Sequence, residues 1–205
     1  MTTNHETEAA DLLQALPAVT DAELAALHDR LAERSAAEGV LDVAYRTLDT
    51  PVGTLLLAAT ETGLVRIAYP VEGHDQVLQA LAAQVSPRIL NAPRRLDAAA
   101  REIGEYFAGQ RRAFDLPLDH RLSAGFRRKV LGHLPGIGYG HTASYATVAA
   151  AVGSPRAFRA VGTACATNPL PVVVPCHRVV KSGGDLGNYR GGPAAKRLLL
   201  DLEAA

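Results

Sequence analysis

The pattern of apolar positions from Leu41 onward predicts short strands. The segments VAYRTL, GTLLLAAT and GLVRIAY are apolar or alternating, and turn residues separate them at Thr50-Pro51 and at 61–63. Consecutive strands joined by tight turns pair as neighbours, so we expect a three-stranded antiparallel sheet. The segment AFDLPL at 113–118 is expected to form a further short strand.

Helical spacing follows this sheet and also precedes it. Apolar residues recur every three to four positions over 74–85 and 95–108, which predicts two helices. Nearer the N-terminus, Thr20 and Glu23 fit a capping box in front of leucines 24, 27 and 31, which predicts a helix over roughly 21–36 and a shorter one at 8–16. We therefore expect a helical extension at 1–40 and an α+β domain at 41–120.

Residues 121–205 are expected to form a mainly helical domain. GFRRKVLGHL predicts a helix that Pro135 ends, and Ser144 is placed to cap a helix through YATVAAAV. Ser154-Pro155 is then expected to start the next helix, which runs through RAFRAVGTACAT. Two helices joined by a tight turn match a helix-turn-helix, a motif that many helical hairpins imitate.

The second of these helices has small and basic residues. Ala160, Gly162 and Ala164 make it slim, and Arg156 and Arg159 give it positive charge. A slim basic helix can approach a nucleic-acid backbone closely, whereas small residues also allow close packing of helix on helix. The residues of this helix alone leave both interpretations open.

The charge of the chain is unevenly distributed. Residues 1–120 contain 10 Lys and Arg against 18 Asp and Glu, a formal charge of −8. Residues 121–205 contain 11 against 3, a formal charge of +8. This asymmetry indicates that the second half, and not the first, contacts a polyanion.

Composition also excludes several classes. No window of about 18 apolar residues exists, and the acidic start MTTNHETEAADLL lacks the basic and apolar segments of a signal peptide. The chain has no Cys-x-x-Cys pair, and its seven histidines are scattered singly, so no zinc site is expected. We therefore expect a cytoplasmic protein without a membrane segment, a disulfide framework or a bound metal.

The stretch LPVVVPCHRVVKSGG at 170–184 holds the candidate nucleophile, Cys176. Its valines predict a buried strand that ends at Pro175, because proline cannot donate to a sheet ladder. Free cysteine among valines is typical of an inert buried thiol. A thiol at a strand end beside His177 and Arg178 is instead typical of a reactive thiolate, because nearby cations lower a thiol pKa. Both interpretations stay open on this stretch alone.

A reactive Cys176 needs a base and a group that orients it. On a continuing strand, His177 would point to the opposite face from Cys176, so either the chain turns after Pro175 or a water links the two side chains. A carboxylate would then hold the other ring nitrogen. Asp185 and Glu203 are the nearby candidates in sequence, and Glu203 is preferred because it lies on the predicted last helix.

Three segments together resemble the O6-alkylguanine-DNA alkyltransferase family: SYATVAAAVGSPRAFRAVGTACATNP, NPLPVVVPCHRVV and GDLGNYRGG. The resemblance covers roughly 122–205. It implies an α+β fold, in which a ribonuclease-H-like domain at 41–120 precedes a helical alkyl-acceptor domain at 121–205 of winged-helix or helix-turn-helix type. Residues 1–40 match nothing in that pattern.

The resemblance implies a direct and irreversible DNA repair reaction that needs no cofactor. The protein would bind double-stranded DNA through the minor groove as a monomer and flip out an O6-alkylguanine, with O4-alkylthymine as a further candidate. The alkyl group would pass to Cys176, once per molecule.

It also implies roles for individual residues. His177 would act as base through a bound water, oriented by Glu203, while Asn168 braces the active-site turn and Tyr145 donates to guanine N3. The implied DNA-binding residues are Arg159, as the finger that fills the gap left by the flipped base, with Arg156, Ala160, Gly162 and Cys165. The implied pocket residues are Val179, Tyr189, Arg190, Gly191 and Lys196.

This chain departs from the family pattern at Arg190, where relatives often have a small residue. Three rival functions are weaker. A lesion-binding protein without repair activity would lack Cys176, and a sequence-specific regulator would need a recognition helix with more side chains that read bases. A thiol hydrolase would need an oxyanion hole, for which the sequence shows no motif.

Overall fold

The computed structural model describes residues 19–204, and the chain divides into two compact units, Met1–Gly39 and Val40–Ala205. In the first unit, α2 spans Asp21–Ala37, which confirms the helix predicted over 21–36. Thr20 and Glu23 form the expected capping box, with the Glu23 N–H donating to Thr20 Oγ1 at 3.3 Å. The shorter helix predicted at 8–16 lies outside the described residues.

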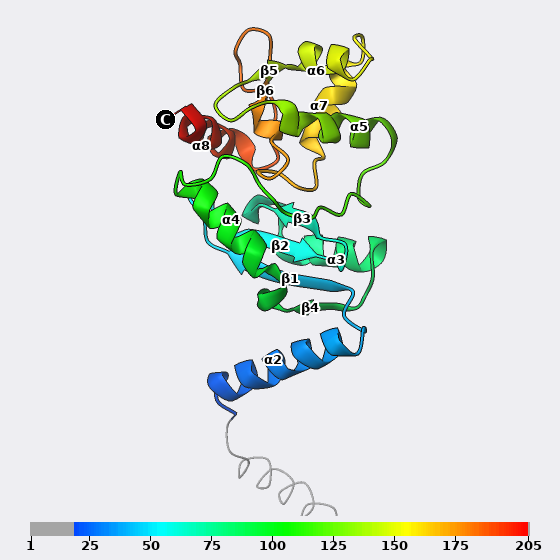
Figure 1. The fold of residues 1–205 in the computed structure, drawn as a ribbon, viewed down its shortest axis with the longest axis vertical. Coiled ribbons are helices and arrows are strands. Elements are labelled where there is room, and N and C mark those ends of the chain that lie inside the picture. Colours follow the sequence, from blue (N-terminus) through cyan, green and yellow to red (C-terminus); the bar gives the residue numbers. More distant parts are fainter. Residues whose placement is uncertain (1–18, 205) are drawn as a thin grey trace, which may run out of the picture. The chain divides into compact units, whose positions relative to one another are not determined.

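The second unit begins with a four-stranded sheet. Its strands are β1 (Val43–Leu48), β2 (Leu55–Ala59), β3 (Leu64–Ala68) and β4 (Ile89–Asn91), in the order β3-β2-β1-β4 (Figure 1). The pairs β1–β2 and β2–β3 are antiparallel, as predicted. The expectation of three strands is corrected by β4, a three-residue strand parallel to β1.

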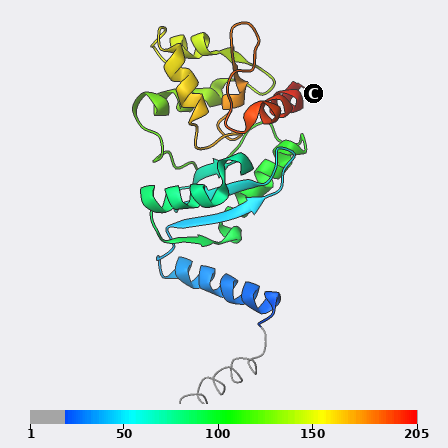
Figure 2. The same ribbon diagram turned by 180° about the vertical axis from the view of Figure 1, so that it is seen from behind.

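Two helices cover the faces of this sheet. They are α3 (His74–Gln84) and α4 (Asp97–Phe107), and each is preceded by a 3₁₀ turn, Pro70–Glu72 and Pro93–Leu96. Figure 1 shows α4 in front of the sheet, and Figure 2, from behind, shows α3 in front of it. Every residue of β2 is buried, as expected for a strand covered on both faces.

The segment AFDLPL does not form the predicted strand. It makes a single parallel bridge, between Leu118 and Leu64, and the Leu64 N–H donates to the Pro117 carbonyl at 2.8 Å. Pro117 has no N–H of its own to extend the pairing, so the contact ends after one bridge.

The C-terminal half is mainly helical, as predicted. Its elements are α5 (Gly125–His133), a 3₁₀ turn (Leu134–Gly136), β5 (Ala143–Ser144), α6 (Tyr145–Ala151), α7 (Phe158–Ala166), a second 3₁₀ turn (Cys176–Arg178), β6 (Val179–Val180) and α8 (Gly192–Ala204). The short strands β5 and β6 pair in parallel, a contact that the sequence did not indicate. This half lies beyond the β3 edge of the sheet (Figures 1 and 2), where the Ile67 N–H donates to the Pro169 carbonyl at 2.8 Å.

The helix-turn-helix consists of α6 and α7. Ser144 caps α6 as predicted, because its Oγ accepts from the Thr147 N–H at 3.0 Å. The predicted start of the second helix is wrong. Ser154 closes a turn, with its carbonyl accepting from the Ala157 N–H at 2.8 Å, and α7 begins only at Phe158.

The valine run at 172–174 is a turn and not the predicted strand. The Val174 N–H donates to the Leu170 carbonyl at 2.8 Å, and Val172 has φ 71°. A left-handed conformation is costly for a β-branched residue, by roughly 1–3 kcal/mol, and persists only where neighbouring contacts fix it. The apolar character of the run reflects burial, because all three valines are buried.

Among residues 19–204, no helix is long and apolar enough to cross a membrane.

Candidate active site

Cys176 lies at the first position of the 3₁₀ turn Cys176–Arg178, directly after the strained turn at Val172. Asn168 holds both. Its amide nitrogen donates to Cys176 Sγ at 3.1 Å and to the Val174 carbonyl at 2.9 Å, and its amide oxygen accepts from the Leu170 N–H at 2.9 Å. Asn168 is fully buried, so these contacts fix the position of the sulfur as well as the turn.

Of the two interpretations of Cys176 that the sequence left open, the structure agrees with a buried thiol and not with an exposed, acidified one. Cys176 is only 1% exposed. Burial raises its pKa to about 11, although the Asn168 hydrogen bond and the nearby Lys196 ammonium act in the opposite direction. In this conformation the resting group is a thiol, and a reaction through sulfur requires a base that removes its proton.

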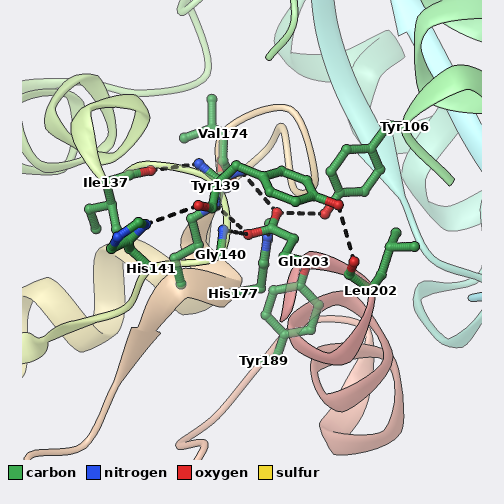
Figure 3. Close-up of polar contacts among 12 residues, drawn as sticks. Tyr106, Ile137, Tyr139, Gly140, His141, Val174, His177, Tyr189, Leu202 and Glu203 are labelled. Carbon is green, nitrogen blue, oxygen red and sulfur yellow. Dashed lines mark hydrogen bonds and ion pairs between the residues drawn. The ribbon is translucent and has the colours of Figure 1, made fainter. Parts of the chain in front are cut away.

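His177, the next residue in the chain, is the candidate for that base. Burial lowers the pKa of its imidazole, so the ring is neutral at pH 7. Its Nε2 lies 2.8 Å from Glu203 Oε1 (Figure 3). Because a carboxylate can only accept, Nε2 carries the proton, and Nδ1 keeps the lone pair. Nδ1 is buried and makes no hydrogen bond with any described residue.

Glu203, on α8, is the centre of a buried polar network. Burial alone would raise its pKa, but hydrogen bonds from His177, Arg178 and Tyr106 outweigh this and lower the pKa to about 2. The Tyr106 hydroxyl donates to Oε1 at 2.7 Å, and Arg178 Nε donates to Oε2 at 2.8 Å. The Gly140 N–H donates to Oε2 at 3.3 Å, so four residues from three segments of the chain donate to one carboxylate (Figure 3).

Two members of this network differ from the sequence analysis. Arg178 was expected to acidify the thiol, but its guanidinium contacts Glu203 and the Ile137 carbonyl. Tyr106 was missed, because a buried aromatic residue on a helix of the first half gives no chemical signal in the sequence. The alternative carboxylate, Asp185, is excluded, since its side chain is 78% exposed and pairs with Lys181.

The exposed side of α7 is the candidate DNA-binding face. Arg159, Ala160 and Phe158 are exposed, and Gly162 is partly exposed. The Arg159 guanidinium lies over the Phe158 ring, 5.6 Å from its centroid. Phe158 carried no signal in the sequence analysis because helical spacing would equally make it a core residue. Beside this face is a cavity of about 540 Å³, lined by Tyr145, Phe158, Arg159, Gly162, Lys181, Gly187 and Asn188.

Two predicted DNA contacts need correction. Cys165 is only 3% exposed, so it packs in the interior and cannot contact a groove. Burial also raises the pKa of Cys165. Arg156 is exposed, but it lies in the turn before α7 and not on the helix.

Tyr145 lies at the N-terminus of α6, between α7 and the glycine-rich loop at 181–192. A Cβ on Gly187 would lie 2.6 Å from the Tyr145 hydroxyl, so only glycine allows this approach. Burial raises the pKa of Tyr145 to about 12, which keeps the phenol protonated and able to donate a hydrogen bond.

The predicted pocket residues lie around the same loop. Val179 is buried on β6, and its carbonyl accepts from Lys196 Nζ at 2.6 Å. Lys196 is fully buried and also donates to the Leu186 carbonyl, so it joins β6, the loop and α8. Tyr189 packs edge-on against His177, with 6.4 Å between ring centroids (Figure 3).

The side chain of Arg190, another implied pocket residue, contacts Glu72 in the turn after β3. Its Nε lies 2.5 Å from Glu72 Oε2, and its Nη1 donates to the Asn168 carbonyl at 3.3 Å. Gly191, the next residue, adjoins the Tyr69 ring. A search of residues 19–204 for a metal site finds no group of three or more His, Cys, Asp or Glu side chains that could hold an ion.

Comparison with known proteins relates both parts of the second unit to one family. Residues 43–120 match the 6-O-methylguanine DNA methyltransferase ribonuclease-like domain, and residues 125–205 match the DNA-binding domain of the same family. These matches span most of the second unit and include every side chain of the Cys176 site.

Individual relatives match over nearly their whole length. A methylated-DNA–protein-cysteine methyltransferase of Mycolicibacterium paratuberculosis is 40% identical over 161 residues, which cover 78% of this chain and 92% of the relative. The constitutive enzyme of that name from Bacillus subtilis is 39% identical, over 78% of this chain and 94% of its own length. The crystal structure of Mycobacterium tuberculosis OGT in complex with DNA is 37% identical and superposes with a TM-score of 0.68, over 78% of this chain and 92% of that one. The chain therefore belongs to the 6-O-methylguanine DNA methyltransferase family.

Proposed function

We propose that this protein repairs alkylated DNA directly, by transferring the alkyl group of O6-alkylguanine to Cys176 in a single turnover, with O4-alkylthymine as a second substrate. The observation that carries the proposal is the arrangement around the sulfur. A buried thiol held by Asn168 is followed in the chain by a neutral histidine whose proton position Glu203 fixes. The names of the relatives, and the DNA complex of one of them, support DNA as the partner.

The proposed reaction begins with removal of the thiol proton. His177 Nδ1 takes it through a water. The chain turns after Pro175, so Cys176 and His177 do not face opposite sides as they would on a continuing strand. The imidazolium so formed is stabilised by the ionised Glu203, whose low pKa prevents it from taking the proton itself.

The thiolate then attacks the alkyl carbon in line with the C–O6 bond. The S–C bond forms, the C–O6 bond breaks, and its electron pair passes to guanine. Tyr145 donates a proton to guanine N3 and regains one from the His177 imidazolium, so the proton lost by sulfur ends on the base, where exchange with water moves it from N3 to N1. The products are guanine and S-alkyl Cys176. The thioether has no ready leaving group for water to displace, so the protein acts once.

We propose that the target base is flipped out and that the exposed face of α7 lies in the minor groove. Ala160 and Gly162 allow the helix backbone to approach the DNA closely, and Arg159 fills the gap in the stack. Minor-groove contacts carry little sequence information, which suits an enzyme that must search all DNA. The cavity beside Tyr145 and Arg159 is of the size that protein pockets use for small ligands, so it is the proposed entry for the base.

The proposal includes the domain division 1–40, 41–120 and 121–205, which the family matches at 43–120 and 125–205 support. It also includes a monomer that acts in the cytoplasm, because one Cys176 and one α7 per chain suffice for the reaction. No cofactor takes part in the proposed steps.

A stoichiometric titration tests this function. A fixed amount of protein is mixed with increasing amounts of duplex DNA containing O6-methylguanine, and restored guanine is measured. We expect a plateau at one guanine per chain, and no restored guanine with Cys176→Ala. Continued turnover past one equivalent, or full activity of Cys176→Ala, would contradict the proposal.

A further inference from the structure

The loop at 181–192 needs support from outside itself. Five of its twelve residues are glycines, at 183, 184, 187, 191 and 192, so its backbone has unusual conformational freedom. Its tip, at 181–185, is exposed. Yet this loop carries Tyr189 against His177 (Figure 3), so its position determines part of the site.

One turn of the ribonuclease-like domain contacts three consecutive residues of this loop. The Tyr69 and Tyr189 hydroxyls lie 2.9 Å apart, and Glu72 Oε2 lies 2.5 Å from Arg190 Nε. A Cβ on Gly191 would lie 2.6 Å from the Tyr69 ring, so that residue is in direct contact as well. The 3₁₀ turn after β3 thus holds the end of the loop next to α8.

Glu72 is the charged centre of these contacts. Its side chain is only 10% exposed, and Oε2 also pairs with Arg66 Nη2. Its Oε1 accepts from the Tyr69 N–H at 2.9 Å, which fixes the carboxylate within the turn. A buried carboxylate between two guanidinium groups is strongly held, because removing it would leave two cations facing each other.

The same contacts lead to the residue that holds the nucleophile. Arg190 Nη1 donates to the Asn168 carbonyl at 3.3 Å, and Arg66 Nη1 donates to the Pro169 carbonyl at 3.2 Å. Asn168 in turn donates to Cys176 Sγ. Glu72 is therefore connected, through one arginine on each side, to the turn that positions the sulfur.

We propose that Glu72 is a positioning residue for alkyl transfer: through Arg190 it fixes Tyr189–Gly191, so that the ribonuclease-like domain determines the shape of the base pocket. This rests on the function proposed above, in which the flipped base enters the cavity that Lys181, Gly187 and Asn188 of this loop help to line. Arg190 is then a tether to the first domain and not an obstruction in the pocket.

A double-mutant cycle on Glu72→Gln and Arg190→Ala tests the tether. Transfer from free O6-benzylguanine is followed over a range of concentrations, which separates the half-saturating concentration from the limiting rate. We expect each single variant to raise the half-saturating concentration roughly five- to tenfold, with the limiting rate changed less than about twofold, and the double variant to be no worse than either single. Arg190→Ala is the variant less prone to unfold, because Arg66 remains paired with Glu72.

Two further variants sharpen the cycle. Asp97→Asn breaks another ion pair of the same domain, Arg46–Asp97 at 2.8 Å, and we expect no change in transfer. Arg190→Lys keeps the charge but loses the planar fork, and we expect it to restore part of the lost affinity. The tether would be overturned if the effects of Glu72→Gln and Arg190→Ala on the half-saturating concentration were additive in free energy. It would also be overturned if these variants lowered the midpoint of unfolding but left the half-saturating concentration unchanged.

A second measurement is independent of the reaction. Amide hydrogen exchange at 186–192 should become faster in Glu72→Gln and in Arg190→Ala, and stay unchanged in Asp97→Asn. Unchanged exchange in the first two variants would also overturn the tether. Failure of the proposed function would show differently, as an absence of single-turnover transfer to Cys176 in the unaltered protein.

Discussion

The buried site around Cys176 and the exposed face of α7 belong to one domain but are built in opposite ways. Glu203 accepts hydrogen bonds from four residues and His177 is fully buried, so the ring has one orientation and one tautomer. On α7, Arg159 lies over the neighbouring Phe158 ring and both side chains are exposed.

Under the proposed function, the difference follows from what each region has to do. Proton transfer depends on which nitrogen carries the proton, so a fixed network is needed. Contact with DNA of any sequence instead requires side chains that can rearrange at little cost. Changes in the first region should therefore affect the reaction with every substrate, and changes in the second should affect only duplex DNA.

The largest effect after loss of Cys176 itself is expected from Glu203→Gln. Without the negative charge, the imidazolium loses its stabilisation, and transfer from both duplex and free O6-benzylguanine should slow by about a hundredfold. The matched variant Tyr106→Phe removes one hydrogen bond to the same carboxylate and keeps the charge, so it should slow transfer only a few-fold. A Glu203→Gln protein that is folded, as shown by its circular dichroism, and transfers at the normal rate would exclude the proton route.

Arg159→Ala should separate the two regions. Loss of the finger makes base flipping less favourable, so repair of duplex DNA should slow roughly tenfold, while reaction with free O6-benzylguanine stays unchanged. Arg156→Ala is the control, because Arg156 is exposed but lies outside α7. It should only weaken binding, reducing the dependence of log affinity on log salt by about 0.9 if it contacts one phosphate. Equal slowing on both substrates would remove the finger role.

The dependence of transfer on pH should identify the base. The thiol has a pKa raised to about 11, and the pKa of His177 is lowered, so proton removal by neutral His177 predicts a flat rate between about pH 6.5 and 9. The rate should fall only at lower pH, as His177 takes up a proton. Glu203 stays ionised throughout, because its pKa is lowered to about 2. A rise of about tenfold per pH unit from 7 to 9 would instead indicate an unassisted thiolate.

Cys165→Ala should have the smallest effect. Cys165 is buried, and its raised pKa keeps it a thiol, so transfer should change by less than about twofold. The small cavity left behind should lower the free energy of unfolding by about 1 kcal/mol, measured by urea titration. Loss of alkyl uptake in a folded Cys165→Ala protein would mean that the second thiol takes part.

The sequence predicted an element correctly where residues close together in the chain determine it. The capping box at Thr20, the cap at Ser144 and the antiparallel pairing of β1 to β3 depend on residues close in sequence, and they were predicted correctly. The three-residue strand β4 was not predicted, because it pairs in parallel with β1, from which β2, β3 and α3 separate it in the sequence. Pairing of distant segments leaves little trace in a single short run.

The candidate site likewise depends on contacts between distant residues that the sequence did not indicate. Pro-Cys-His-Arg and the segments around it indicated the chemistry, but the valine run was read as a strand. The left-handed conformation of Val172 is held by the Val174–Leu170 backbone bond and the buried hydrogen bonds of Asn168, which no local pattern indicated. Tyr106 and Glu72 reach the site from the first domain through tertiary contacts alone, so spacing in the sequence could not indicate them.

The most direct test of the account is to locate the transferred alkyl group. The protein is incubated with duplex DNA carrying isotopically labelled O6-methylguanine, digested with trypsin and analysed by tandem mass spectrometry. Trypsin cleaves after Arg159 and Arg178, so both cysteines fall in one peptide, 160–178, and fragment ions between them must assign the label. The account predicts one labelled methyl group per chain, on Cys176 and none on Cys165. Label on Cys165, or on neither cysteine, would contradict it.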